Sequence, residues 1–497
     1  MTYEVVVVGG GIGGLTVAAL LAARGMKVCL FERQSNTGGC AANIDTGGYS
    51  FEGGAGLYSS WGPGELHQRI FNELSVPAPE ATVCEPAYSV RLADHSDVSI
   101  GANEGEFEET IAANFPECAL QAVAFYRRLS AADAAIRSAA ARWPDLGRVS
   151  SFGRLRALGD RTVRNLLSFK NDLLATHLQT TSPRFRQFID AQLQMFGQCS
   201  SSDCPFLYGA VALMLPRRGM YQLRGGGSAL AECLTECIRR SGGTVRLNSS
   251  VLRLAHDTDG EPAGVHLLNG ETVEASRAII SDLTIWDTYG KLLGRDRSPP
   301  HIHEELKAMQ SLGAYMLYLG MAEGAAERLP ATHILAAPNP GQENEDEFAS
   351  SPFVFAATPS WDRRAPAGQR AVTVWTQTDT EKWFTFHRDH TEIEAQDQRT
   401  LEAWWQRIHT ALPELGGEIE VIESESPQTF YERTRRRLGM AGGVAQLMSS
   451  FGAAPFIPFN HKTPIPKLFM VGDTTFPGQG VAAVSHSALV LADELTK

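Results

Sequence analysis

The 497-residue sequence has no run of about 18 uninterrupted apolar residues, which is the length that a membrane-spanning helix requires. Its first residues also lack a basic segment followed by an apolar one, so no signal peptide is predicted. We therefore expect a cytoplasmic protein without a transmembrane helix. The composition, with 43% hydrophobic and 20% charged residues, likewise excludes a disordered or fibrous chain.

Cysteine is scarce: the chain has 8 cysteines, and their irregular spacing excludes a disulfide framework and indicates a reducing compartment. Cys233 and Cys237 lie on one predicted helix, but no second pair completes a four-ligand zinc site. The segment His301–Glu305 holds histidines and glutamates, yet it follows two prolines and is typical of a solvated helix start. We therefore predict no metal site.

Basic residues are fewer than acidic ones. The chain has 44 Lys and Arg residues and 56 Asp and Glu residues, which gives a formal net charge of −12 at pH 7. Nucleic-acid binding requires a basic surface that replaces phosphate counterions. We therefore predict no nucleic-acid partner.

One segment, residues 151–190, departs from this acidic balance, because seven basic residues lie among leucines with only three acidic ones. A basic amphipathic segment suits an anionic bilayer surface, so a peripheral membrane contact is one hypothesis. A solvated helix packed on its own domain is the other. The basic residues are Arg154, Arg156, Arg161, Arg164, Lys170, Arg184 and Arg186. A second basic group allows the same two interpretations and consists of Arg433, Arg435, Arg436 and Arg437.

Glycine, in contrast, is abundant, with 47 residues that fall in clusters. The first cluster, G-x-G-x-x-G at Gly9, Gly11 and Gly14, follows the β-branched run Val5–Val8, which predicts a strand buried on both faces of a parallel sheet. The first glycine makes a tight turn, the second lets the backbone approach a pyrophosphate, and the third allows close helix–strand packing. Glu32 ends the next predicted strand, where a carboxylate binds a ribose. This segment predicts a dinucleotide site at a helix N-terminus.

Later features favour FAD over NAD as the dinucleotide. Gly38 and Gly39 follow Glu32 closely, and a further glycine-rich turn spans residues 47–56. Near the end of the chain, Asp473 follows a predicted strand and precedes a predicted helix. A carboxylate there can bind a ribityl hydroxyl, and the helix N-terminus can stabilise negative charge on a reduced flavin. Residues 224–228 lack a preceding β-branched strand and an acidic partner, so we predict a turn there and no second site for NAD(P)H.

These pieces together resemble the glutathione-reductase-type FAD domain of the flavin amine oxidase superfamily. Two segments, DTTFPGQGV at 473–481 and TPSWDRRAPAG at 358–368, resemble motifs of the phytoene desaturase and carotenoid isomerase family of FAD-dependent oxidoreductases. Segments 182–192 and 426–430 are similar to the same family, so the resemblance extends over nearly the whole chain. It implies an α/β fold, in which a Rossmann FAD domain assembled from discontinuous segments is joined to an α+β substrate domain with a mixed sheet.

The resemblance also implies where the two domains lie in the chain. The FAD-binding segments are 1–65, 217–290 and 461–497, and the substrate-domain segments are 66–216 and 291–460. In the middle FAD segment, Ser228 is predicted to cap the helix that contains Leu230 and Leu234.

The residues that contact FAD are implied in the same way, whereas no catalytic side chain is assigned. Many relatives carry Arg after the glycine pair, where this chain has Cys40. The backbone at Val251 is expected to face the adenine. The predicted cofactor-binding residues are Gly9, Gly11, Ile12, Gly13, Gly14, Glu32, Arg33, Gly38, Gly39, Cys40, Ala41, Gly54, Ala55, Val251, Gly472, Asp473, Gly480 and Val481.

The implied activity is oxidation–reduction on a long apolar polyene, such as a carotenoid. A desaturase would transfer an allylic hydride to flavin N5 and pass electrons to a diffusible acceptor, a quinone or oxygen, whereas an isomerase would use reduced flavin to weaken a double bond. Reduction or reductive cyclisation of another natural-product polyene is an alternative. A non-catalytic lipid or isoprenoid escort is the alternative from another class, although an escort has no need of intact flavin motifs. In an enzyme of this kind the flavin carries the chemistry, and the protein supplies orientation and a dry pocket.

Overall fold

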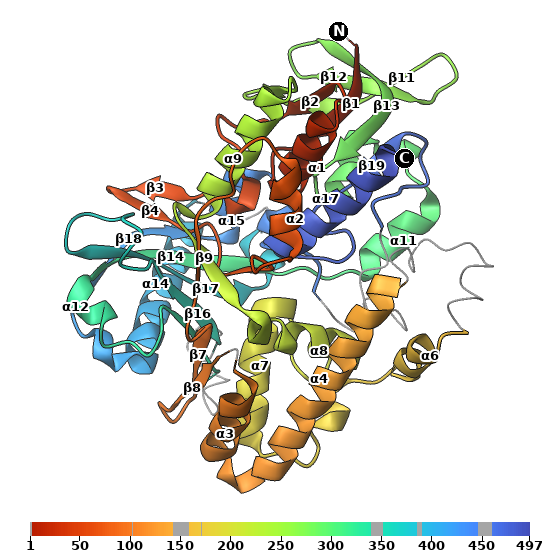
Figure 1. The fold of residues 1–497 in the computed structure, drawn as a ribbon. Coiled ribbons are helices and arrows are strands. Elements are labelled where there is room, and N and C mark those ends of the chain that lie inside the picture. The colour runs from red at the N-terminus through yellow and green to blue at the C-terminus, as the bar shows by residue number, and fades with distance from the viewer. Residues whose placement is uncertain are drawn as a thin grey trace.

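A computed structural model describes residues 2–101, 103–142, 159–169, 171–338, 351–384, 390–445 and 460–497 of the chain. These residues form two seven-stranded sheets and two smaller ones. Figure 1 shows a helical layer below the two large sheets. The combination of mixed sheets and helices confirms the predicted α/β fold.

The first sheet has the strand order β10-β2-β1-β13-β12-β11, with β19 paired to β13. The strands β10, β2, β1, β13 and β19 run parallel, whereas β12 is antiparallel to both of its neighbours. Three distant parts of the chain therefore build one sheet. The assignment of these parts to an FAD-binding domain stays a prediction. The bounds are β1 (Thr2–Val8), β2 (Val28–Phe31), β10 (Thr244–Arg246), β11 (Val251–His256), β12 (Pro262–Leu267), β13 (Thr272–Ser281) and β19 (Leu468–Met470).

The valine run of β1 is buried on both faces of the sheet. Helices cover one face, and a separate core cluster covers the opposite face. Val5 and Val7 belong to the core cluster that contains residues of α1 (Ile12–Ala23), α9 (Gly226–Arg240) and α17 (Val481–Leu495). Val6 and Val8 belong to a separate core cluster on the opposite face. In Figure 1, α1 and α17 lie side by side over the sheet, and both contact each other closely. The carboxyl ends of the parallel strands thus meet at one edge, where cofactors bind in such sheets.

The predicted role of Ser228 as a helix cap is wrong. Helix α9 begins at Gly226, and its N-cap is Gly225, whose φ of 76° lies in the left-handed region that glycine adopts readily. Ser228 lies in the first turn, where its hydroxyl accepts a hydrogen bond from the Asn43 N–H at 2.8 Å. The serine therefore ties α9 to the loop after Gly39.

The second sheet has the order β18-β14-β17-β16-β15-β7-β8 and is mixed, since β15 and β7 are parallel and the other pairs antiparallel. Trp404 and Ile408 of α14 (His390–Ala411) pack with the buried side chains of this sheet in one core cluster. The bounds are β7 (Tyr88–Arg91), β8 (Asp97–Ile100), β14 (Gly313–Ala322), β15 (His333–Ala336), β16 (Phe353–Ala357), β17 (Gln369–Thr378) and β18 (Ile419–Glu425).

A helical layer packs beside this sheet around a cluster of phenylalanines that includes Phe115, Phe185 and Phe188. Its helices are α3 (Glu104–Asn114), α4 (Ala119–Arg142), α7 (Pro183–Gly197) and α8 (Phe206–Met214). The small sheets are β3 (Ile44–Thr46) with β4 (Tyr49–Phe51), and β5 (Tyr58–Ser59) with β9 (Met220–Leu223) and β6 (Ala81–Val83). The remaining helices are α2 (Leu66–Glu73), α6 (Arg161–Ser168), α10 (Ile285–Asp287), α11 (Pro300–Ala308), α12 (Glu323–Ala326) and α15 (Pro427–Thr434). Among the described residues, no helix combines the length and hydropathy needed to cross a membrane.

Candidate functional site

A cavity of about 1160 Å³ runs from the carboxyl edge of the first sheet to the walls formed by β14, β17, α7 and α8. All of the predicted cofactor-binding residues except Gly14 line this cavity. Gly14 lies behind the wall, where an added Cβ would come within 2.4 Å of the Gly9 carbonyl oxygen. The structure therefore brings the predicted residues together from four parts of the chain, and their contacts with a cofactor stay predictions.

The glycine turn is held in place by the carboxylate at the end of β2. Glu32 accepts hydrogen bonds from the Gly10 N–H at 2.7 Å and from the Gln34 N–H at 2.8 Å. Gly9 has a φ of 106°, which only glycine adopts without strain. Glu32 thus shapes the turn in addition to lining the cavity.

We expect Glu32→Ala to weaken FAD binding by about 10- to 100-fold, because charge-assisted hydrogen bonds of this kind contribute about 1.5–3 kcal/mol. The dissociation constant follows from fluorescence titration of the flavin-free protein with FAD. Glu274→Ala is the matched control, since Glu274 is an exposed carboxylate on β13. Equal affinities of the two variants would contradict a ribose or turn-shaping role for Glu32.

Asp282, which the sequence analysis missed, lies inside the glycine turn. It follows β13 directly, and its N–H donates to the Val8 carbonyl at 2.9 Å. A Cβ added at Gly11 would lie 2.5 Å from one carboxyl oxygen of Asp282, and one added at Gly13 would lie 2.7 Å from the other. The glycines therefore make room for this carboxyl group as well as for a ligand. Its position after a parallel strand, like that of Asp473 after β19, was the signal available in the sequence.

The carboxyl group of Asp282 is held in an environment that favours its neutral form. Burial raises its pKa well above the usual range, and the nearby carboxylates of Asp473 and Glu32 raise it further. The Gly14 N–H and the Arg436 guanidinium act in the opposite direction but do not compensate. A neutral carboxylic acid can donate a hydrogen bond, whereas a carboxylate only accepts.

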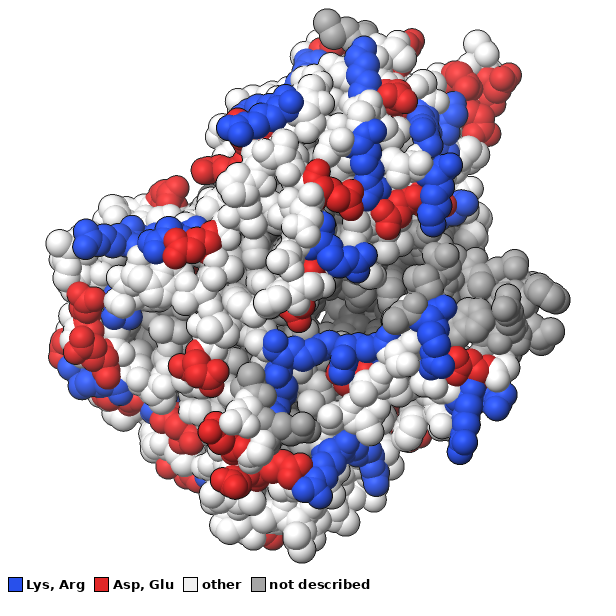
Figure 2. All heavy atoms as spheres, viewed as in Figure 1, with Lys and Arg blue, Asp and Glu red and all other residues white. Residues whose placement is uncertain are grey.

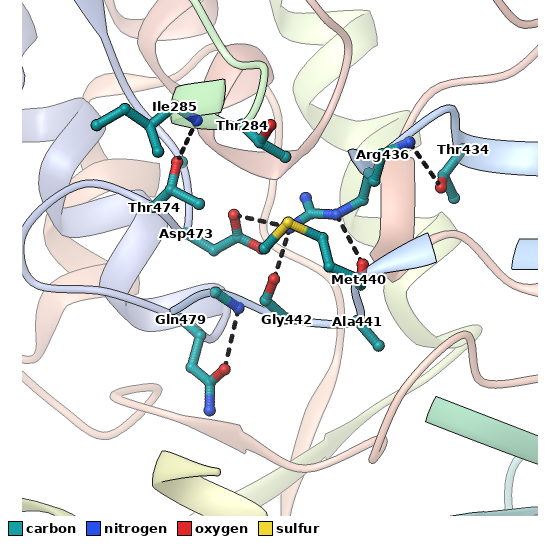
Figure 3. Close-up of polar contacts among 12 residues, drawn as sticks. Thr284, Ile285, Thr434, Arg436, Met440, Ala441, Gly442, Asp473, Thr474 and Gln479 are labelled. Carbon is teal, nitrogen blue, oxygen red and sulfur yellow. Dashed lines mark hydrogen bonds and ion pairs between the residues drawn. The ribbon is translucent and has the colours of Figure 1, made fainter. Parts of the chain in front are cut away.

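Arg436 fixes the position of Asp473 (Figure 3). Its Nη2 lies 2.9 Å from Asp473 Oδ2 and donates to the Gly442 carbonyl at 2.5 Å, while its Nε donates to the Met440 carbonyl at 3.1 Å. Burial lowers the pKa of Arg436, but the Asp473 carboxylate outweighs it and holds the guanidinium charged. Arg436 also acts electrostatically on the half-buried thiol of Cys40, so a positive charge from a distant segment lies near this residue.

These contacts favour the interpretation that the second basic group packs within the protein over a membrane contact. Arg433 pairs with Glu425 at 2.8 Å, and Arg436 pairs with Asp473, so both are bound within the protein. In the first basic segment, Arg184 pairs with Asp94 at 2.7 Å. Arg161 and Arg164 belong to α6, while Arg154, Arg156 and Lys170 lie outside the described residues.

A buried ion-pair cluster supports the glycine-rich loop at 53–56. Arg364 lies between Glu52 (2.9 Å) and Asp362 (2.8 Å), and Tyr58 donates to Glu52 at 3.0 Å. The Nε2 of His333, on β15, contacts the Ala55 carbonyl at 2.8 Å. Burial lowers the pKa of His333 to about 4, so the imidazole is neutral near pH 7. The loop that lines the cavity is therefore fixed by His333 of the second sheet and by residues of the segment between β16 and β17.

Away from the glycine turn, the cavity wall is mostly apolar. Its lining side chains include Met195, Phe196, Tyr208, Met316 and Trp375. Within the described residues, no group of three or more His, Cys, Asp and Glu side chains is arranged to hold a metal ion. The arrangement therefore offers a polar dinucleotide cleft that opens into an apolar chamber, which suits a flavin facing an apolar substrate.

Comparisons with known proteins agree with this geometry. The family model described as flavin-containing amine oxidoreductase matches residues 12–496. The chain is 24% identical to a chloroplastic prolycopene isomerase of Daucus carota, over 99% of this chain and 79% of that protein. It is 26% identical to a zeta-carotene-forming phytoene desaturase of Myxococcus xanthus, over 99% of this chain and 93% of that protein. The crystal structure of an oxidoreductase from Methanosarcina mazei shares the fold, with a TM-score of 0.63 at 16% identity, and the match covers 99% of this chain and 100% of that one.

Proposed function

Because the chain belongs to the flavin-containing amine oxidoreductase family, we propose that this FAD-dependent enzyme acts on a long apolar polyene, by desaturation or by cis–trans isomerisation. The observation that carries the proposal is the continuous cavity, whose polar cleft at the glycine turn leads into the apolar chamber. The similarity to a prolycopene isomerase and a phytoene desaturase over 99% of the chain supports the same substrate class.

In this proposal the residues around the glycine turn hold the FAD. The N-terminus of α1 and the turn Gly9–Gly14 receive the diphosphate, Glu32 the ribose, Val251 the adenine and Asp473 the ribityl chain. The cofactor supplies hydride or electron transfer when bound, and the apolar wall orients the polyene and excludes water. The proposed domain division, with FAD-binding segments 1–65, 217–290 and 461–497, agrees with the strands that make up the first sheet.

The proposed electron acceptor is a quinone or oxygen. A peripheral membrane contact, which would give access to an apolar substrate, stays a prediction that concerns Arg161 and Arg164 of α6 together with residues outside the described part of the chain.

Chromatography and mass spectrometry of the polyene pool, in cells with and without this chain, test the proposal. A loss of two hydrogens identifies desaturation, and an unchanged mass with a shifted absorption spectrum identifies isomerisation. A gain of two hydrogens would contradict both desaturation and isomerisation and would indicate the reductase alternative. An unchanged pool in cells that make the flavin-loaded protein and contain carotenoid precursors would contradict the polyene substrate.

A further inference from the structure

Two arginines lie in the wall of the apolar chamber, on α4 and directly after α8. Arg137 and Arg218 both line the cavity, and the carboxylate of Asp133 lies between them. Asp133 is 2.9 Å from Arg137 Nε and 3.5 Å from the nearer Arg218 nitrogen, and its side chain is only 4% exposed. One carboxylate is thus shared by two guanidinium groups, and Glu65 is the second acidic group that acts on Arg218.

Arg218 is the less satisfied member of the cluster. Its Nε is buried and has no hydrogen-bond partner among the described residues, and its contact with Asp133 is an ion pair without a hydrogen bond. Its neighbour Arg217 differs, because that guanidinium donates to the Gly101 carbonyl at 2.9 Å and stacks 3.8 Å from the centroid of the Phe107 ring. The buried Nε is costly to leave without an acceptor, whereas the rest of the Arg218 side chain, which is 30% exposed, is open to a ligand in the cavity.

An apolar strip leads from this arginine pair to the predicted flavin segment. Tyr208, Val211, Ala212 and Leu215 line the cavity, and their spacing places them on one face of α8, which ends shortly before Arg218. The seven steps from Tyr208 to Leu215 extend about 10 Å along the helix axis.

The far end of this strip adjoins the C-terminal flavin motif. The Phe196 carbonyl accepts hydrogen bonds both from the Tyr208 hydroxyl at 2.6 Å and from the Gln479 amide at 2.7 Å. At the other end, Met220, two residues after Arg218, pairs with Ser59 of β5. On the face shown in Figure 2, Lys and Arg side chains border the central hollow between the first sheet and the helices α4 and α8.

We infer that Arg218, together with Arg137, binds a carboxylate at one end of the substrate, whose apolar chain lies along the α8 strip toward the flavin motif. A carboxylate matches the planar guanidinium fork and supplies the hydrogen-bond acceptors that Asp133, at 3.5 Å, does not give Arg218. A pure hydrocarbon would instead leave Arg218 against an apolar surface. This inference rests on the proposed polyene substrate and narrows it to polyene acids.

The test compares three ligands of equal chain length: an apocarotenoic acid, its methyl ester and the matching hydrocarbon. Their dissociation constants for the FAD-loaded protein are measured by fluorescence quenching. We expect the acid to bind about 10- to 100-fold more tightly than the ester and the hydrocarbon. In Arg218→Gln the preference for the acid is expected to vanish while the affinity for the hydrocarbon is retained, and in the control Arg217→Gln the preference is expected to persist.

The other outcomes would each contradict the carboxylate site, the role of Arg218 or the polyene proposal. Equal binding of all three ligands by the wild-type protein would overturn the carboxylate site and leave the polyene proposal standing. An ester that binds as tightly as the acid would show that a neutral oxygen suffices, which also overturns it. If none of the three binds, the polyene proposal itself fails. A thermal melt of each variant separates loss of the site from loss of the fold, and a correctly folded Arg218→Gln that still prefers the acid would overturn the role of Arg218.

Discussion

The variant Arg364→Met is expected to lose about 3–5 kcal/mol of unfolding free energy, because it leaves the carboxylates of Glu52 and Asp362 buried without their partner. All three side chains are only 6–8% exposed, and Arg364 lies 2.9 Å and 2.8 Å from the two carboxylates. Methionine keeps much of the apolar volume of the arginine stem, so the change isolates the lost charge. A urea titration followed by circular dichroism measures the effect.

The neighbouring residue provides the control for this prediction. Arg363 is exposed, so Arg363→Met removes the same charge from the surface and is expected to change the stability by less than about 0.5 kcal/mol. Because Glu52 precedes the cavity loop at 53–56, Arg364→Met should also weaken FAD binding, whereas Arg363→Met should not. Coincident unfolding curves for the two variants would show that the buried cluster contributes nothing to stability.

The affinity for FAD is expected to fall about tenfold per pH unit once the pH exceeds the raised pKa of Asp282. The carboxyl group lies among the glycines that are predicted to receive the diphosphate, so its ionised form would repel that ligand. The other charged groups that face it are Glu32, Asp473 and Arg436, two acids and one base. FAD binding is therefore expected to require the protonated acid.

The sign of the pH effect follows from the direction of the shift. The folded protein binds the Asp282 proton more tightly than the unfolded chain does, because burial raises the pKa. The corresponding stabilisation is complete below the unfolded pKa of about 3.9 and is lost as the pH rises through the folded value. FAD affinity should decline over the same upper part of that range.

Asp282→Asn separates this effect from the titration of other groups. The amide keeps the shape and the hydrogen-bond donor but cannot ionise, so FAD affinity should lose most of its dependence on pH. Fluorescence titrations of the flavin-free wild-type and variant proteins, in buffers from acid to mildly alkaline pH, measure both slopes. Identical slopes in the two proteins would assign the pH dependence to a group other than Asp282.

The sequence alone predicted the parts of the site that depend on local geometry. The run Val5–Val8, the glycines after it and Glu32 follow one another along the chain, and each has its role within one strand–turn–helix unit. The tight turn requires glycine at Gly9, where φ is 106°, whatever the rest of the fold does. The fold class was predictable from the family resemblance that these motifs carry, and the bounds of the FAD-binding segments stay a prediction.

The prediction that Ser228 caps helix α9 was wrong, and the reason is again the local sequence. Ser, Thr, Asp and Asn are preferred caps, but three successive glycines precede this serine and allow the helix to begin earlier, with Gly225 in the left-handed region. The hydroxyl then became available to a loop about 185 residues away in sequence, through its bond with Asn43. Local preference predicted a helix start at the serine, and the glycines before it set the start at Gly226 instead.

Only the tertiary structure decided which charges surround the cavity. Arg436 and Asp473 are 37 residues apart, Glu52 and Arg364 are 312 apart, and no periodicity in the sequence links either pair. Whether Arg433 and Arg436 face solvent or a carboxylate, and whether Asp282 keeps its proton, depends on the groups that packing brings within a few ångströms. Charge interactions depend on distance and burial, which the order of residues along the chain does not specify. The sequence therefore determined that this protein binds a flavin, and the packing of distant segments determined how that site and the adjoining apolar chamber are charged.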